Sequence, residues 1–215
     1  MRIFRCIDLF SLDYSVFKGF FDRLASILAL LMVSPLMLFA YSMVRWRLGR
    51  PVLFRQLRPG LYGRPFWLLK FRTMTEVRDS SGALLSDSQR LTPFGRWLRS
   101  TSIDELPELF NILCGEMSFI GPRPLLMQYL PLYSPQQARR HDVKSGFSGW
   151  AQINGRNAIS WEEKFLLDVW YVDHQSFLLD FRIFLLTVWK VLRREGISAA
   201  GEATMEPFAG NAESA

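Results

Sequence analysis

The amino-acid sequence predicts an α+β fold that is mainly helical, with a small β-hairpin, interfacial amphipathic helices and an amino-terminal helix that enters a membrane. Three observations lead to this prediction. The segment from Leu24 to Val44 is apolar and carries no charge. Residues 51–74 place apolar residues typical of strands on both sides of a connection that contains glycine. Residues 176–194 form a second strongly apolar segment.

The first apolar segment has the length of a membrane-spanning helix. As a straight helix it would measure about 31 Å, and the hydrocarbon core of a bilayer is about 30 Å thick. Ser34 and Pro35 lie in its middle. Pro35 cannot donate to the carbonyl of Leu31, and the Ser34 hydroxyl can bond back to the carbonyl of Leu30. A kinked spanning helix and a re-entrant helix of two arms both fit this pattern.

The charges that flank this segment favour the re-entrant helix. Cations lie on both sides of it, at Lys18, Arg23, Arg45, Arg47 and Arg50. Because cations near membrane segments concentrate in the cytoplasm, both ends are expected there, which a single span cannot satisfy. We therefore expect a re-entrant helix hairpin, broken at Ser34 and Pro35.

The length of 215 residues suits one compact domain in addition to the membrane element. We expect the re-entrant helix within residues 1–50 and a cytosolic catalytic domain over 51–197. Residues 198–215 are small, polar and acidic, which predicts a loosely ordered tail. The sequence has two distant cysteines and no signal peptide, which indicates a reduced cytoplasmic compartment.

The net charge of +6 fits a protein that lies on an anionic membrane leaflet or binds phosphates. The basic residues are scattered among aliphatic runs, and no nucleic-acid-binding motif is visible. We expect no nucleic-acid partner.

The predicted hairpin carries two cations on its second strand. Because side chains alternate along a strand, Lys70 and Arg72 share one face, and Trp67, Leu69 and Phe71 occupy the other. We expect a cationic face above a packed apolar face.

The apolar segment 176–194 is interrupted by Asp180 and Arg182, so it is a poor membrane span. Its aromatic residues stand beside Lys and Arg, which is typical of a helix in the membrane interface. A buried core helix is equally compatible with the pattern.

Two adjacent acids, Asp104 and Glu105, precede Pro107 in the stretch RSTSIDELPELFNILCG. Proline favours the first position of a helix and glycine the position after its end, so we expect a helix from Pro107 that stops before Gly115. Acids just before a helix suit a metal-binding or nucleophilic role, and they are also common as structural residues there.

Two arginines stand in settings that suit a phosphate. Arg123 lies between two prolines, which stiffen the backbone that presents its guanidinium. Arg156 follows a glycine-punctuated stretch that predicts either a cradle for phosphate or uridine or a plain surface loop.

Four motifs, in order, follow the Ser-Pro-interrupted segment: LLKFRTM, RSTSIDELPELFN, MSFIGPRPLL and SGWAQINGRNAISWEEKF. Together they resemble the bacterial sugar transferase family, also called monotopic phosphoglycosyl transferases, and in particular the small branch that consists of the catalytic unit alone. The resemblance implies transfer of a sugar 1-phosphate from a UDP-sugar donor to the acceptor undecaprenyl phosphate, a polyprenyl phosphate, with release of UMP. It also implies a bacterial inner membrane, the cytoplasmic face, Mg²⁺, and downstream glycosyltransferases that extend the product.

The resemblance further implies roles for individual residues. Asp104 corresponds to the nucleophile that takes up the phosphosugar, and Glu105 completes an acidic dyad that holds magnesium. Arg99 corresponds to a cation for the lipid phosphate. The family's substrate-binding positions fall on Lys70, Arg123, Arg156 and Asp180. A membrane-anchored phosphohydrolase and a non-catalytic scaffold are the alternatives from other classes.

Overall fold

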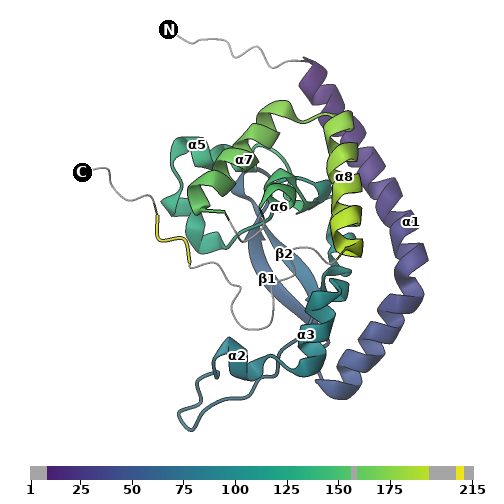
Figure 1. Ribbon diagram of the computed structural model, residues 1–215, viewed down its shortest axis with the longest axis vertical. Coiled ribbons are helices and arrows are strands. Elements are labelled where there is room, and N and C mark those ends of the chain that lie inside the picture. The colour runs from purple at the N-terminus through teal and green to yellow at the C-terminus, as the bar shows by residue number, and fades with distance from the viewer. Residues whose placement is uncertain (1–8, 156–158, 194–206, 211–215) are drawn as a thin grey trace.

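The structure is a computed structural model that describes residues 9–155, 159–193 and 207–210. It is mostly helical with two small sheets, which confirms the α+β prediction (Figure 1). The helices are α1 (Leu9–Arg47), α2 (Asp87–Arg90), α3 (Pro93–Ser100), α4 (Glu108–Cys114), α5 (Pro135–Ala138), α6 (Trp150–Asn154), α7 (Trp161–His174) and α8 (Phe177–Leu192). The strands are β1 (Leu53–Pro59), β2 (Pro65–Phe71), β3 (Ser118–Ile120) and β4 (Gly146–Ser148).

Helix α1 runs without interruption through Ser34 and Pro35, and it is bowed along the long axis of the molecule (Figure 1). The expected break into two separate arms is therefore not found. The Ser34 hydroxyl donates to the carbonyl of Leu31, at 3.0 Å, and not to that of Leu30. Within the described residues, Tyr14–Arg47 is the one helical segment long and apolar enough to cross a membrane.

One narrow stripe of α1 packs against the rest of the protein. Its residues recur every three or four positions, as one face of a helix requires: Gly19, Asp22, Ser26, Leu30, Val33, Met37, Ala40 and Val44. The middle of the stripe lies against α4, and its later part lies against Val52, Phe71 and Leu98. The remaining circumference exposes large apolar side chains, among them Phe17, Leu31, Met32 and Phe39.

Strands β1 and β2 form the predicted hairpin, in antiparallel register with Phe54 opposite Lys70. The expected packed face is confirmed only at Phe71, which is 3% exposed and packs against Val44 and Leu98. Phe66 and Leu68, on the Lys70 face, are buried against α4, whereas Trp67 is 56% exposed. Lys70 therefore points toward the protein and not toward solvent.

The second sheet pairs β3 with β4 in parallel and was not predicted. β4 and α6 occupy most of the stretch expected to be a glycine-punctuated loop. The glycines serve close packing: a Cβ at Gly149 would lie 2.1 Å from the carbonyl oxygen of Gly121.

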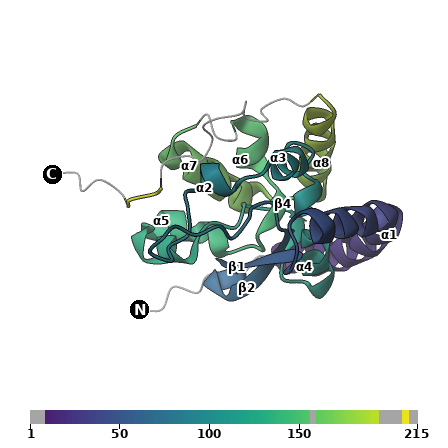
Figure 2. The same cartoon turned by 90° about the horizontal axis from the view of Figure 1, so that it is seen from below.

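Helix α8 is amphipathic and lies along the same side of the molecule as α1 in both views (Figures 1 and 2). Its inner face contributes the fully buried Ile183 to the core. Its outer face is apolar and exposed, which excludes the fully buried alternative. The exposed residues are Phe177, Leu178, Phe181, Phe184, Leu185, Val188, Trp189 and Val191.

The carboxyl-terminal tail contains an anchored segment at residues 207–210. Phe208 is only 6% exposed, and its ring lies 5.0 Å from that of Phe165, between the centroids. Tyr129, Tyr133 and Trp161 complete the cluster. The expectation of a loosely ordered tail does not hold for this segment.

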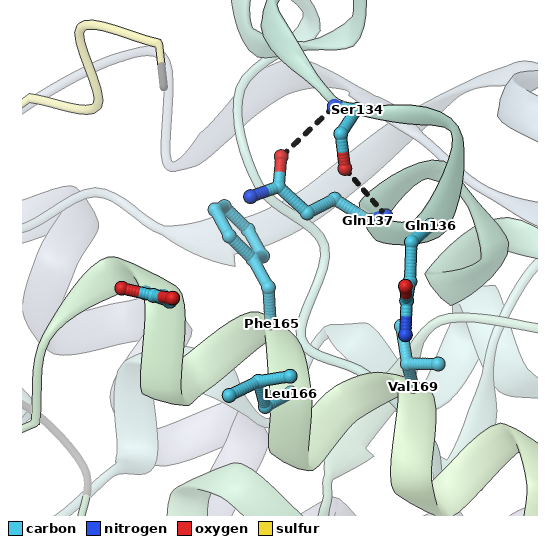
Figure 3. A pocket seen from close by; sticks show the side chains of 7 residues that line it. Ser134, Gln136, Gln137, Phe165, Leu166 and Val169 are labelled. Carbon is cyan, nitrogen blue, oxygen red and sulfur yellow. Dashed lines mark hydrogen bonds between the residues drawn. The ribbon is translucent and has the colours of Figure 1, made fainter. Parts of the chain in front are cut away.

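A small hollow lies between α5 and α7 (Figure 3). Phe165 and Leu166 line it from α7, and Gln137 closes a capping box with Ser134 on the opposite side. It contains none of the residues predicted for the functional site, so that site must be sought elsewhere.

Phe208→Ala should lower the thermal stability of the protein. Burial of a phenylalanine side chain contributes about 2 kcal/mol, which corresponds to roughly 4–8 °C in Tm for a chain of this size. The measurement is thermal unfolding of the detergent-solubilised protein. A chain that ends after Gly210 keeps Phe208 and should unfold at the wild-type temperature; equal Tm values for all three proteins would show that Phe208 does not anchor the tail.

Candidate active site

Asp104 and Glu105 lie in a short turn between the end of helix α3 and the beginning of helix α4. Thr92 caps α3 by accepting from the Gly95 amide, at 2.9 Å, and Pro93 occupies the first turn. After α3, Ser102 adopts a left-handed conformation, with φ of 56°. This reversal leads into a short 3₁₀ turn, Ile103–Glu105, that carries both acids directly ahead of α4.

Helix α4 closely follows the predicted boundaries. It begins at Glu108, with Pro107 as its capping residue, one position later than expected. It ends at Gly115, where φ of 80° gives the left-handed conformation that glycine adopts without strain. Asn111 extends this helix's contact with the hairpin, because its amide accepts from Leu69 N and donates to Trp67 O.

Asp104 is a buried acid without a partner. The residue is 7% exposed, and its carboxylate has no hydrogen bond or ion pair within the described part of the chain. Burial, followed by the charge of Glu105, raises the pKa of Asp104 to about 6, against the opposing charges of Lys70, Arg99 and Arg123. Such a carboxylate is free to take a metal ion or attack an electrophile.

Glu105 is held by two cations. Its Oε1 accepts from Lys70 Nζ at 2.5 Å and from Arg123 Nη2 at 2.6 Å. Although burial acts in the opposite direction, the charges of Arg123 and Lys70 hold the pKa of Glu105 well below its usual range. Both contacts use Oε1, so Oε2 is left to bind another group.

Glu108 is a third acid of the site that the sequence analysis missed. It is buried in the first turn of α4, and its Oε1 lies 3.1 Å from Lys70 Nζ. Burial, opposed by Lys70 and assisted by the charge of Glu105, raises the pKa of Glu108 to about 7. Glu108 follows Glu105 by three residues, a spacing that places two side chains on the same face of a helix. This spacing was the feature of the sequence from which Glu108 could have been predicted.

Arg99 reaches the site from α3. Its Nε donates to the Thr73 hydroxyl at 3.1 Å, and its charge opposes the rise in the Asp104 pKa. The close approach depends on Gly95, where a Cβ would lie 1.9 Å from the Thr73 carbonyl oxygen. The structure therefore brings Lys70, Arg99 and Arg123 together around the acidic pair.

The backbone that presents Arg123 is held at every carbonyl. Gly146 N donates to Pro122 O at 3.0 Å, and Arg58 Nη1 approaches Pro124 O at 3.4 Å. Arg140 donates to Arg123 O at 2.8 Å. The stiffness predicted from the two prolines is reinforced by these bonds.

Arg140 and Asp168 form a buried support behind Arg123 that the sequence did not reveal. Arg140 Nη2 lies 2.7 Å from Asp168 Oδ2, and both side chains are at most 2% exposed. The rings of Tyr133 and Phe165 lie within 5.9 Å of the Arg140 guanidinium. The same two rings pack against Phe208, so the tail anchor adjoins this support.

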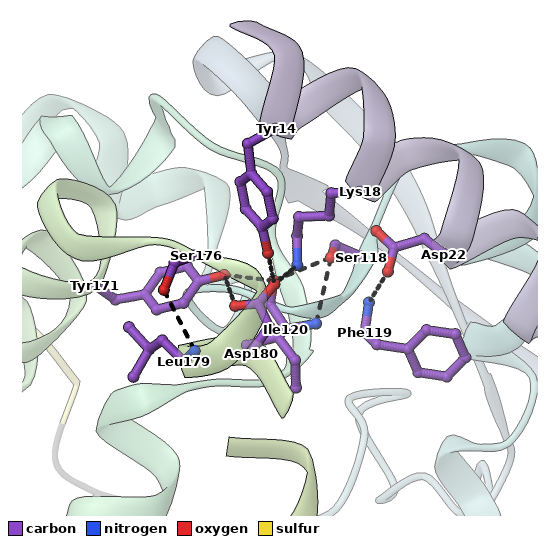
Figure 4. A network of polar contacts seen from close by, with 10 residues as sticks. All are labelled: Tyr14, Lys18, Asp22, Ser118, Phe119, Ile120, Tyr171, Ser176, Leu179 and Asp180. Atoms are coloured by element: carbon purple, nitrogen blue, oxygen red, sulfur yellow. Dashed lines mark hydrogen bonds and ion pairs between the residues drawn. The ribbon is translucent and has the colours of Figure 1, made fainter. Parts of the chain in front are cut away.

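Asp180 lies in a different network from the acidic pair (Figure 4). One carboxylate oxygen accepts from Tyr171 OH at 2.6 Å, and the other accepts from Tyr14 OH at 2.7 Å and pairs with Lys18. These contacts join α8 to the amino-terminal part of α1. In this structure Asp180 connects two helices, and the substrate role implied for it stays a prediction.

Arg156, the remaining predicted site residue, lies outside the described residues. The part of the chain that the structure describes contains no group of three or more His, Cys, Asp or Glu side chains arranged as a metal site. The two unpaired donors, the Asp104 carboxylate and Glu105 Oε2, fit the one or two carboxylates by which Mg²⁺ is bound together with substrate phosphates.

Comparison with known proteins identifies relatives of the chain. The sequence matches the bacterial sugar transferase family over residues 13–194. It is 59% identical over 196 residues to the uncharacterized sugar transferase EpsL of Bacillus subtilis, and the match covers 91% of this chain and 97% of EpsL.

Other relatives are named for the reaction that they catalyse. A UDP-glucose:undecaprenyl-phosphate glucose-1-phosphate transferase of Xanthomonas campestris is 39% identical, with 83% of this chain and 39% of the relative covered. An undecaprenyl-phosphate galactose phosphotransferase of Salmonella typhimurium is 35% identical, with 83% and 41% covered. The chain thus spans about two fifths of the length of these two relatives.

Asp104→Asn should stabilise the metal-free protein at neutral pH. The folded-state pKa of about 6 lies above the ordinary 3.8, so ionised Asp104 opposes folding above pH 6. The shift corresponds to at most about 3 kcal/mol. The gain in Tm should shrink as the pH falls through 6 and disappear near pH 4.

The measurement is thermal unfolding in EDTA between pH 4 and pH 8. Glu105→Gln is the matched control with the opposite sign, because the charges of Arg123 and Lys70 lower its pKa and its ionised form stabilises the fold. If Asp104→Asn lowers the Tm at pH 8, the carboxylate has a partner and the unpaired geometry is wrong.

Proposed function

Because the chain belongs to the bacterial sugar transferase family, we propose that it transfers a sugar 1-phosphate from a UDP-sugar to undecaprenyl phosphate and releases UMP. The observation that carries this proposal is the unpaired, buried carboxylate of Asp104 among three cations. Such an arrangement suits attack on a phosphate whose negative charge the cations compensate.

The proposed reaction has two balanced steps. An oxygen of Asp104 attacks the phosphorus that carries the sugar, and the bond from that phosphorus to the bridging oxygen breaks, so that UMP leaves with the electron pair. A phosphate oxygen of undecaprenyl phosphate then attacks the same phosphorus, and the bond to Asp104 breaks. The lipid-linked diphosphosugar forms and the carboxylate is regenerated.

The neighbouring residues position the reacting groups. Lys70 and Arg123 fix Glu105 and thereby the turn that carries Asp104. Arg99 stands on α3, where its charge reaches Asp104, and suits the phosphate of the lipid acceptor. Asp104 and Glu105 Oε2 would hold Mg²⁺, which would neutralise charge on the donor diphosphate.

The exposed surfaces of α1 and α8 support a place at the membrane. Both helices expose large apolar side chains. The two helices lie along the same side of the molecule in Figures 1 and 2. The protein packs along α1 from Gly19 to Val44, so neither end of the apolar segment is separated from the cationic domain. We propose that α1, as one bowed helix without a break, enters the cytoplasmic leaflet of a bacterial inner membrane and leaves it on the same side, so that both ends lie in the cytoplasm.

The exchange should proceed through a covalent phosphosugar on Asp104. Enzyme supplied with its UDP-sugar and Mg²⁺, but without undecaprenyl phosphate, should release UMP in a burst no larger than its own molar amount. Mass spectrometry should locate the adduct on the peptide that contains Asp104. Asp104→Asn should lose both adduct and turnover, about 10³-fold or more, because an amide is a poor nucleophile.

The matched control is Asp142→Asn, a half-exposed acid outside the site, which should retain the burst. Continuous release of sugar phosphate without lipid would instead indicate a phosphohydrolase. Turnover by Asp104→Asn at a rate comparable to the wild type would indicate that the lipid phosphate attacks the donor directly. An inactive Asp104→Asn variant that still performs the protein's role in cells would indicate a non-catalytic scaffold.

The re-entrant arrangement predicts protection of both flanks of α1 from the periplasm. Single cysteines at the exposed positions Val16 and Arg50, in a background with Cys6 and Cys114 replaced by serine, should resist an impermeant maleimide in intact cells. Both should react after lysis. Labelling of either position in intact cells would show that α1 spans the membrane.

A further inference from the structure

Arg58 lies beside the candidate active site and has no role in the proposed reaction as described above. It lies in β1 opposite Phe66, and cross-strand partners project from the same face of a hairpin. Phe66 shares that face with Lys70, because the two residues are four positions apart on β2. Arg58 therefore projects toward α4 and the acids, together with Lys70.

The guanidinium of Arg58 is only partly satisfied. Nη2 donates to Gln56 Oε1 at 2.5 Å, and Nη1 reaches Pro124 O at the long distance of 3.4 Å. Nε is buried and has no hydrogen-bond partner. No carboxylate of the described residues forms an ion pair with it, although a guanidinium offers five donors.

Arg58 also has no anion within ion-pair distance among the described residues. Burial, and then the charge of Arg123, lower the pKa of Arg58 to about 10. Lys70 and Arg123 are already paired with Glu105, whereas Arg58 has only a longer-range attraction to Glu108. Of the two neighbouring guanidiniums, Arg123 has a carboxylate partner and Arg58 has none among the described residues, so an additional negative group is needed to pair with Arg58.

Arg140 is an arginine of this fold with a structural role, and its contacts can be compared with those of Arg58. Arg140 is fully buried, pairs with Asp168, donates to a backbone carbonyl and lies against two aromatic rings. Arg58 has none of these carboxylate or ring contacts among the described residues. Its half-buried, unpaired state is typical of a group that binds a ligand.

We propose that Arg58 binds a phosphate oxygen of the nucleotide diphosphate, next to Arg123. This inference rests on the proposed function and deepens it. Arg123 pairs with Glu105, the residue next to Asp104, whereas Arg58 forms no ion pair with Glu105 and approaches the backbone of Pro124 on the far side of Arg123. Arg58 is thereby assigned to the phosphate that leaves with UMP, and the phosphate under attack lies nearer Asp104.

Binding of UDP to the full-length protein with Mg²⁺ tests the proposal, by calorimetry in detergent. Arg58→Gln should weaken UDP binding about 10- to 100-fold, the effect of losing a charged hydrogen bond. Arg58→Lys should be intermediate, because it keeps the charge and loses the planar fork. Arg55→Gln is the matched control: Arg55 is exposed on the opposite face of the same strand and should leave UDP binding unchanged.

Thermal unfolding of the ligand-free variants separates binding from folding. Weaker UDP binding by Arg58→Gln with a wild-type Tm supports the proposal. Unchanged UDP binding by Arg58→Gln overturns the proposal. The proposal is also overturned if Arg58→Lys and Arg58→Gln weaken UDP binding to the same extent and both lower the Tm of the ligand-free protein. If the folded wild-type protein does not bind UDP, the proposed function is wrong. If the wild-type protein binds UDP and the Arg58 variants bind it equally well, only the role proposed for Arg58 is wrong.

Discussion

The ion pairs of Lys70 are the contacts on which the rest of the site depends. A single ammonium group on the hairpin lies 2.5 Å from Glu105 and 3.1 Å from Glu108, so it connects β2 to both the acid-bearing turn and α4. Although burial acts in the opposite direction, the charges of Arg123 and Lys70 favour the ionised state of Glu105. Burial raises the pKa of Glu108 to about 7, against the opposing charge of Lys70. Asp104, one residue away, is left outside this pairing and stays free for chemistry.

The same packing joins the site to the membrane-facing surface. Phe66 and Leu68, which share the strand face of Lys70, are buried against α4, and the stripe of α1 packs against the same apolar cluster. Displacement of α1 would therefore disturb the helix that begins directly after Asp104 and Glu105. In the proposed function this connection fixes the height of the nucleophile above the membrane, where the phosphate of the lipid acceptor lies.

Local rules predicted the hairpin, the end of α4 at Gly115 and the stiff mounting of Arg123, because turn glycines and prolines act within a few residues. They did not predict which face of the hairpin would pack against the protein. The alternation of side chains along a strand shows which residues share a face, but it does not show which of the two faces is buried. The interruption at Pro35 is absent because a long helix can continue through a proline while packing on one side. Glu108, Arg58 and Phe208 gain their importance only from contacts distant in sequence.

The distribution of charge explains why the site needs more than its acidic pair. Glu105 already occupies Lys70 and Arg123, so these two cations cannot fully compensate an incoming diphosphate. Arg58 and Arg99 have no carboxylate partner among the described residues and are therefore the cations left to receive phosphate oxygens. A cation held by Asp104 and Glu105 would oppose both causes of the raised Asp104 pKa, which are burial and then the charge of Glu105. In the proposed function, the unpaired acid and the arginines without a carboxylate partner are complementary parts of one site, which the charged substrate would complete.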